Sequence, residues 1–363
     1  MGNRVKMKKT VTFAISVAVG LGLLGGVLYW VGVGGILAQV SALGAAGLLA
    51  VIANVILSMV AYVMGWWVIL RIYGVDLPLP TAIAARLGGY AVSYLTPTLY
   101  FGGEPVRAIM AMRRTSATGP RLIATIVVER FLGGVAVLVF LIIGTFTVAL
   151  HPEIDVSSRH SVFAGMAFIS FWLLIGLVNF AWNFKWISRA IRWLKRPFRR
   201  WANGLERAAN KVSETEDEIA NAFTHHWRGT LLAFVIQLVV TFLVFIRPLI
   251  FFYYSSAVVF SPGQLWILYV FNLMLSFLLW ITPGGLGTSE AAMIGIFTLV
   301  GIGKHGAVAY SLIFKSVELI FVAIGVMCIV RVGLTRTGEP RSRRRSSQSA
   351  PDERKQHTDR LDL

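Results

Sequence analysis

Apolar residues in this chain gather in runs that are long enough to cross a bilayer. A helix needs about 20 residues to span a hydrocarbon core of about 30 Å. Runs of that length fall at residues 11–33, 44–70, 123–150, 161–184, 229–254 and 307–330. Two further apolar regions, 83–111 and 264–302, are interrupted near their middles by Thr-Pro and glycines. This pattern predicts an all-α polytopic integral membrane protein with about six full spans and two broken regions.

The two broken regions carry related motifs that begin 186 residues apart. The first, TPTLYFGGEPVRA, begins at Thr96, and the second, TPGGLGTSEAAM, begins at Thr282. Six residues separate Thr-Pro from a glutamate in both motifs, Glu104 in the first and Glu290 in the second. Breaks and charges at membrane depth are costly unless they line a polar cavity, so a repeated pair is typical of transporters built from repeats. The expected break residues are Thr96, Pro97, Gly102, Gly103, Thr282, Pro283, Gly284, Gly285 and Gly287.

Basic residues between the runs predict the topology, because clusters of Lys and Arg normally lie on the cytoplasmic side. The clusters fall at residues 4–9, 107–121, 185–211 and 331–345. Both termini should therefore be cytoplasmic, region 83–111 should begin and end inside, and region 264–302 should begin and end outside. The result is an inverted-topology repeat of two helix–helix–hairpin–helix units, 11–150 and 161–332, each with a re-entrant hairpin. If region 264–302 instead crosses the membrane twice, the spans number about eight.

Three segments outside the spans are polar or basic. Residues 1–10 form a basic cytoplasmic N-terminus, and residues 333–363 have almost no apolar side chains, which predicts a disordered basic tail. Residues 185–228 interrupt the second unit. Their first part interleaves tryptophan and isoleucine with basic residues, and their second part has one apolar stripe. We expect this amphipathic segment to lie on the cytoplasmic face of the cell membrane, against anionic headgroups.

Composition excludes several classes of protein. Of 363 residues, 56% are hydrophobic and 14% are charged, whereas soluble domains carry about 25% charged residues. The net charge of +17 is explained by basic loops between spans, so we expect no nucleic-acid partner. A single cysteine, Cys328, excludes an intrachain disulfide and a cysteine-based metal cluster. No serine-hydrolase, zinc-protease or Walker motif is present, so we expect no enzyme, cofactor or metal.

The glutamates of the two motifs are the first candidates for a binding site. Glu104 and Arg107 are three residues apart and share a face of a helix that starts near Pro105. Alternatively, Glu104 only caps that helix and Arg107 extends to the surface. Glu290 follows a glycine-rich break whose free N–H groups would suit an anion, or it is simply a helix cap.

Further candidate charges lie inside the apolar runs. Arg130 is next to Glu129 near the start of one run, and Lys315 lies one turn before Glu318 in the last run. Basic residues at such depth pair with acids or bind an anionic substrate. Arg247 directly precedes Pro248 and could bind a phosphate with two hydrogen bonds, or extend to the outer surface.

Several of these segments together resemble a known family. The stretches GGEPVRAIMAMRR, IVVERFLGG and PGGLGTSEAAMIGIFTLVGI look like the flippase-like membrane domain of lysylphosphatidylglycerol synthases, over roughly residues 10–332. The resemblance implies lipid translocation between leaflets. It places the motif residues of the family at Glu104, Arg107, Glu129, Arg130, Pro283, Gly284, Gly285, Gly287 and Glu290. Lys315 departs from the family pattern, in which we expect an arginine at this position. Lysine keeps the charge but cannot form the bidentate hydrogen bonds of an arginine.

The resemblance also limits the expected activity. Only a short tail follows residue 332, in place of the soluble aminoacyl-transferring domain of the full-length synthases, so we expect no lysylphosphatidylglycerol synthesis. The leading hypothesis is flipping of an anionic phospholipid or a polyprenyl-phosphate-linked lipid. Its site would be formed by Glu104, Arg107, Glu129, Arg130, Arg247, Glu290, Lys315 and Glu318. One alternative is a lipid-binding accessory protein that serves a partner glycosyltransferase or lipid-modifying enzyme, and another is an enzyme acting on polyprenyl-phosphate lipids.

Overall fold

The fold is described from a computed structural model of the chain. It describes residues 21–96, 102–150, 226–278 and 282–334, with scattered residues between 160 and 217. All regular secondary structure in these residues is helical, which confirms the predicted all-α class. The predicted tail, the basic N-terminus, Pro97, the run 161–184 and the amphipathic segment 185–228 lie wholly or largely outside the described residues.

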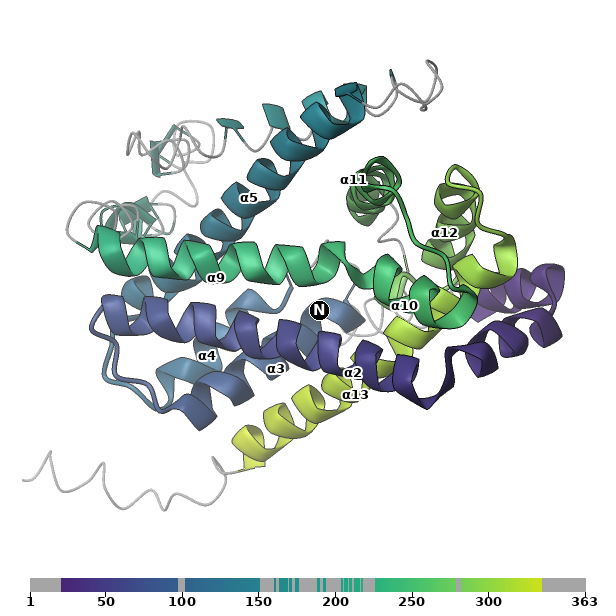
Figure 1. Cartoon of the computed structure of the whole chain (residues 1–363). Helices are drawn as coiled ribbons and strands as arrows, with labels where there is room; N and C mark the ends of the chain where they lie inside the picture. Colours follow the sequence, from purple (N-terminus) through teal and green to yellow (C-terminus); the bar gives the residue numbers. More distant parts are fainter. Residues whose placement is uncertain are drawn as a thin grey trace, which may run out of the picture.

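A short helix, Leu21–Val31, precedes the labelled elements of Figure 1. The helices before the gap are α2 (Val33–Ile72), α3 (Leu79–Leu95), α4 (Glu104–Met112) and α5 (Gly119–Leu150). Those after it are α9 (Trp227–Phe245), α10 (Arg247–Ser256), α11 (Pro262–Leu278), the 3-10 turn η2 (Pro283–Gly285), α12 (Thr288–Thr298) and α13 (Lys304–Leu334). We call α2–α5 the N-terminal half and α9–α13 the C-terminal half.

Within the described residues, four helical segments are long and apolar enough to cross a membrane. They are Val33–Ile72, Gly119–Thr147, Trp227–Ser256 and Lys304–Val332. They correspond to the predicted runs at 44–70, 123–150, 229–254 and 307–330. The chain is therefore a helical membrane protein.

Two of these segments differ in detail from the predicted runs. α2 begins at Val33, eleven residues before the predicted start, and bends at Gly44, where φ is 63°. Its 40 residues would extend about 60 Å if straight, about twice the thickness of a hydrocarbon core. The run 229–254 is divided into α9 and α10 at Ile246. Pro248 has no N–H to donate to the carbonyl of Val244, so the regular ladder stops there.

Both predicted breaks are present in the structure. α3 ends at Leu95 and α4 begins at Glu104, with Pro105 in its first turn, where its missing N–H costs nothing. The second break lies between α11 and α12 and contains three glycines with positive φ, Gly284 at 61°, Gly285 at 62° and Gly287 at 78°. Such angles are strained for any residue with a side chain. Glycine therefore allows the chain to turn tightly at this place.

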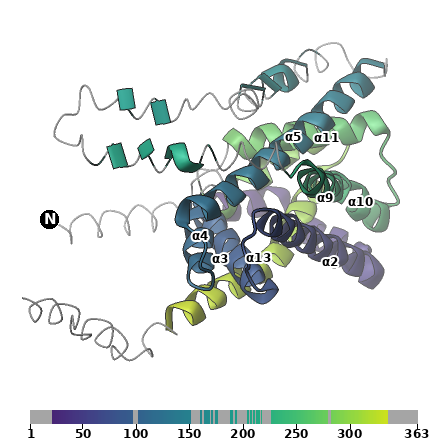
Figure 2. The same cartoon turned by 90° about the vertical axis from the view of Figure 1, so that its left-hand side faces the viewer.

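The two halves pack against each other in a reciprocal way. α2 lies beside α9 and α10, as both cartoon views show (Figures 1 and 2). α3 packs against α13, and α11 packs against α5, so the first arm of each broken region contacts the last helix of the other half. The second arms, α4 and α12, pack against α5 and α13 of their own half. The space enclosed by these contacts contains the candidate site.

Two glycines allow the closest approaches around α3. A side chain on Gly103 would overlap the backbone of Gly89, and one on Gly325 of α13 would overlap the carbonyl of Leu87. Small residues at such crossings bring helix backbones into direct contact, which is how membrane helices pack in the absence of a strong hydrophobic drive.

Candidate functional site

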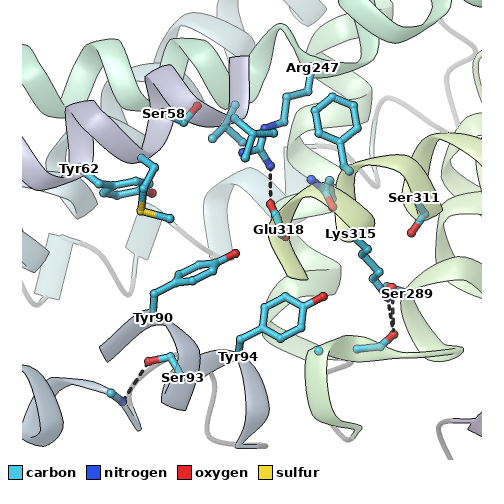
Figure 3. A pocket seen from close by; sticks show the side chains of 18 of the residues that line it. Ser58, Tyr62, Tyr90, Ser93, Tyr94, Arg247, Ser289, Ser311, Lys315 and Glu318 are labelled. Carbon is cyan, nitrogen blue, oxygen red and sulfur yellow. Dashed lines mark hydrogen bonds and ion pairs between the residues drawn. The ribbon is translucent and has the colours of Figure 1, made fainter. Parts of the chain in front are cut away.

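A cavity of about 500 Å³ lies between the two halves and receives side chains from both. Hydroxyl-bearing residues project into it from opposite walls, including Ser58, Tyr90 and Tyr94 (Figure 3). Among the described residues, the charged ones that line it are five basic and two acidic ones, Arg86, Arg107, Arg130, Arg247, Lys315, Glu104 and Glu318. Charges of this number inside a membrane protein need partners or a ligand.

The two most buried of these bases, Arg86 and Arg107, form a trio with Glu129. Arg86 of α3 donates to Oε1 of Glu129 at 2.6 Å, and Arg107 of α4 donates to Oε2 of the same carboxylate. Side-chain exposure is 9% for Arg86, 3% for Arg107 and 2% for Glu129. The Arg107 guanidinium lies 3.7 Å from the ring centre of Trp66. Glu129 thus stands behind the cavity wall and orients the two arginines that line it.

A second pair lies closer to the surface. Arg130 donates from Nε to Oε1 of Glu104 at 2.9 Å, and Nη2 of Arg130 contacts the same oxygen. The Arg130 side chain is 41% exposed and that of Glu104 is 19% exposed. Glu104 is therefore an ion-pair partner of Arg130 on α5. The cap position of α4 is occupied by Gly103, and no side chain caps this helix.

Glu290 is the centre of the second motif. Its carboxylate is fully buried and accepts hydrogen bonds from the N–H of Gly287 at 2.7 Å and from the hydroxyl of Ser311 at 3.1 Å. It also pairs with Nζ of Lys315 at 2.7 Å, and Lys315 donates to the carbonyl of Gly285 at 3.1 Å. Glu290 therefore both caps the start of α12 and fixes the only lysine that lines the cavity in the described part of the chain.

Arg247 faces the cavity from the kink between α9 and α10 (Figure 3). It donates to Glu318 of α13 at 2.9 Å, and its guanidinium lies 5.2 Å from the ring centre of Phe314. Its side chain is 16% exposed. The alternative of extension to the outer surface is wrong for Arg247, and extension to the cytoplasmic surface is wrong for the buried Arg107.

The break residues position these charges. Thr282 is buried and donates to the carbonyl of Leu286 at 2.9 Å, which closes the loop around Pro283. Gly284 packs directly on the ring of Tyr94, across the two halves. In the first break, the N–H of Gly103, which follows Gly102, donates to the hydroxyl of Ser93 at 3.0 Å. The loops hold α4 and α12 with their first turns toward the cavity.

The ion pairs obey a simple rule. The trio and the Glu104–Arg130 pair belong to the N-terminal half, and the Glu290–Lys315 and Arg247–Glu318 pairs belong to the C-terminal half. Each of these ion pairs thus lies within one half, and none joins the two halves among the described residues. The spacing of Lys315 and Glu318 indicated a shared face, and both do line the cavity, but each pairs with a residue of another helix.

Arg86 is the functional candidate that sequence reasoning missed. It lies in the first arm of the broken region 83–111, where it is the one charged residue of the stretch 83–103, and this was a sufficient signal for a buried charge. The aromatic partners Trp66 and Tyr62, which lies 4.7 Å below the Arg86 guanidinium, had no such signal, because aromatic residues are common in spans.

Comparison with known proteins places these features in a family. No curated protein and no solved structure matches the chain. A comparison with protein families matches residues 13–325 to the lysylphosphatidylglycerol synthase TM region. This range contains both breaks and all of the ion pairs of the cavity, and it confirms the resemblance seen in the motifs. The chain belongs to the family of the lysylphosphatidylglycerol synthase TM region.

Proposed function

We propose that the protein moves an anionic lipid between the leaflets of the cell membrane, with the headgroup in the cavity and the tails in the bilayer. The observation that supports this most directly is the cavity lining, in which five basic residues accompany two acidic ones between helices that suit a membrane. A lipid phosphate brought to membrane depth loses its hydration, and cations in the wall would offset that cost. The candidates for the lipid are an anionic phospholipid and a polyprenyl-phosphate-linked lipid.

An inverted repeat would explain how such a site could face each leaflet in turn. The reciprocal packing of α3 on α13 and α11 on α5 is what a two-fold relation between the halves would produce. The charges support the same relation, because Glu104 pairs with a base 26 residues later and Glu290 with one 25 residues later. We infer that α3–α4 and α11–α12 are re-entrant hairpins of two units with opposite orientation and that both termini are cytoplasmic.

Movement of one half relative to the other is the step that this arrangement favours. The headgroup would be held by bases that line the cavity while the halves rock, as in other transporters built from inverted repeats. In this proposal Glu104, Glu129 and Glu290 hold the bases in position, and the protonation of one of them could couple movement to a proton gradient.

Transbilayer movement of labelled lipid in proteoliposomes tests the proposal. Anionic phospholipid and polyprenyl phosphate would be assayed separately, and the wild-type protein is expected to move one of the two. Glu290→Gln and Arg130→Ala should each lower the rate by about tenfold or more, because each removes a charge-assisted contact of the site. Asp76→Asn is the matched control. The Asp76 side chain is 88% exposed, and its ion pair with Arg71 lies outside the cavity.

The controls decide between transport and a passive role. Thermal unfolding in detergent must show that the variants fold. No movement of either lipid by the folded wild-type protein, with lipid still bound, would contradict the transport proposal. That result would instead favour a lipid-binding accessory protein that acts with a glycosyltransferase or another lipid-modifying enzyme.

A further inference from the structure

The charges around the cavity do not balance, and the imbalance lies at one place. In the described part of the chain, Glu104 and Arg130, Glu318 and Arg247, and Glu290 and Lys315 each form a pair of one acid and one base. The trio is different, because one carboxylate, Glu129, serves two arginines. The trio therefore carries one positive charge that no described acid compensates.

The uncompensated positive charge lies on side chains that a ligand in the cavity would contact. Arg86 and Arg107 line the cavity, whereas Glu129 does not and lies behind them. Nε of Arg107 is buried and has no hydrogen-bond partner among the described residues, and the Arg107 side chain is 3% exposed. A buried arginine with a free donor is destabilising unless an acceptor reaches it.

The two guanidinium groups are held rigidly. Each is bonded to Glu129 on one side and lies over an aromatic ring, Tyr62 for Arg86 and Trp66 for Arg107. Arginines fixed in this way lose little conformational entropy when they bind an oxyanion, and their planar forks fit phosphate oxygens.

We propose that Arg86 and Arg107 form the headgroup site and that they select a phosphodiester lipid with a single negative charge and no cationic group. The inference rests on the proposed lipid-binding role of the cavity and names the substrate class. One negative charge neutralises the trio. A phosphomonoester such as a polyprenyl phosphate carries close to two negative charges above neutral pH and would leave one uncompensated. A zwitterionic headgroup would add a cation with no acid left to receive it.

The remaining lining fits an uncharged, hydroxyl-bearing headgroup. Hydroxyl groups of Ser58, Tyr62, Ser289 and Ser311 face the cavity from α2, α12 and α13 (Figure 3). The three serine hydroxyls already donate hydrogen bonds within the protein, so their oxygens remain as acceptors for the hydroxyl groups of a polyol and add no charge.

Binding of three short-chain lipids with the same tails tests the charge rule. Dihexanoyl phosphatidylglycerol, phosphatidic acid and phosphatidylcholine would be titrated into the detergent-solubilised full chain at pH 8, with affinity read by thermophoresis. The wild-type protein is expected to bind the phosphatidylglycerol about tenfold more tightly than either of the others, the size expected for one charge-assisted contact. Tighter binding of phosphatidic acid or phosphatidylcholine would overturn the proposal.

Variants of the trio identify the site. Arg86→Gln and Arg107→Gln should each weaken phosphatidylglycerol binding by about tenfold or more. Each leaves one arginine paired with Glu129, so the unfolding midpoint should stay the same or rise, an outcome that a merely structural role for these residues would not give. Arg86→Lys keeps the charge, so this variant should bind phosphatidylglycerol with an affinity between those of the wild type and Arg86→Gln. The matched control is Arg113→Gln, because Arg113 is exposed, bonds to the carbonyl of Val332 and lies outside the cavity.

The experiment also separates this inference from the transport proposal. Selective phosphatidylglycerol binding that depends on Arg86, without transbilayer movement in proteoliposomes, would retain the site and reject transport. Movement of a lipid with no loss of binding in Arg86→Gln and Arg107→Gln would retain transport and reject the site. Dimethyl phosphate, a diester without tails, distinguishes the source of the ligand. Weak binding of dimethyl phosphate is expected, whereas affinity equal to that of phosphatidylglycerol would mean a soluble diester and would overturn the lipid assignment.

Discussion

Replacement of Gly325 by alanine is expected to lower the free energy of unfolding by about 3 kcal/mol, the upper part of the range for overpacked sites. The added methyl group would overlap the carbonyl of Leu87 and would also meet Ala91 at 2.8 Å. The carbonyl carbon and oxygen of Leu87 and the Cβ of Ala91 all belong to α3, and the helix fixes their positions, so α13 itself would have to move. The measurement is the unfolding transition of the purified protein in detergent.

Gly295→Ala is the matched control for this prediction. Gly295 is also a helical glycine, and a Cβ added there would meet no atom within 4 Å. Alanine at that position should leave the protein unchanged or slightly more stable, because alanine favours the helix over glycine. Equal stability of the Gly325→Ala and Gly295→Ala proteins would show that α3 and α13 do not approach as closely as described.

Glu129→Ala should destabilise the protein by about 3–5 kcal/mol, the usual cost of removing one partner of a buried ion pair. The substitution leaves Arg86 and Arg107 buried, close together and without a counter-ion. The expected result is a large fall of the unfolding midpoint in detergent. Addition of Arg86→Gln to this variant should recover part of the loss, because it removes one of the two unpaired charges.

Asp76→Ala serves as the control for the loss of a carboxylate. Asp76 also pairs with an arginine, Arg71, at 3.0 Å, but its side chain is 88% exposed. Water screens such a pair, so the substitution should leave the midpoint unchanged. A Glu129→Ala protein as stable as Asp76→Ala would contradict the buried, ion-paired trio.

Sequence patterns were sufficient to locate the spans and breaks of the described residues. Length and hydrophobicity determine which segments suit a bilayer, and Pro and Gly mark the places where the helical ladder must stop. The predicted run began only at residue 44, whereas α2 begins at Val33 and continues through Gly34, Gly35 and Gly44. Ile36 and Leu43 are buried between them, and this packing outweighs the low helix propensity of glycine.

The partners of the charges were much harder to predict than the charges. Glu104, Arg130, Glu290 and Lys315 all lie in or beside one cavity. Pairing between helices depends on how the helices cross, and spacing along one helix carries no information about that. Lys315 reaches Glu290 on α12 and Arg247 reaches Glu318 on α13, contacts that only the tertiary arrangement provides.

The confinement of each ion pair to one half has a mechanical consequence. Sliding of the halves past each other would not pull opposite charges apart in a medium of low dielectric constant, a separation that would cost several kcal/mol for each pair. Polar contacts that do join the halves involve uncharged acceptors, such as the carbonyl of Leu243 for Asn54, the carbonyl of Val332 for Arg113 and the side-chain amide of Gln39 for Ser256. Among the described residues the boundary between the halves is thus free of ion pairs, and it would act as a shear plane along which each half carries its own ion pairs unbroken.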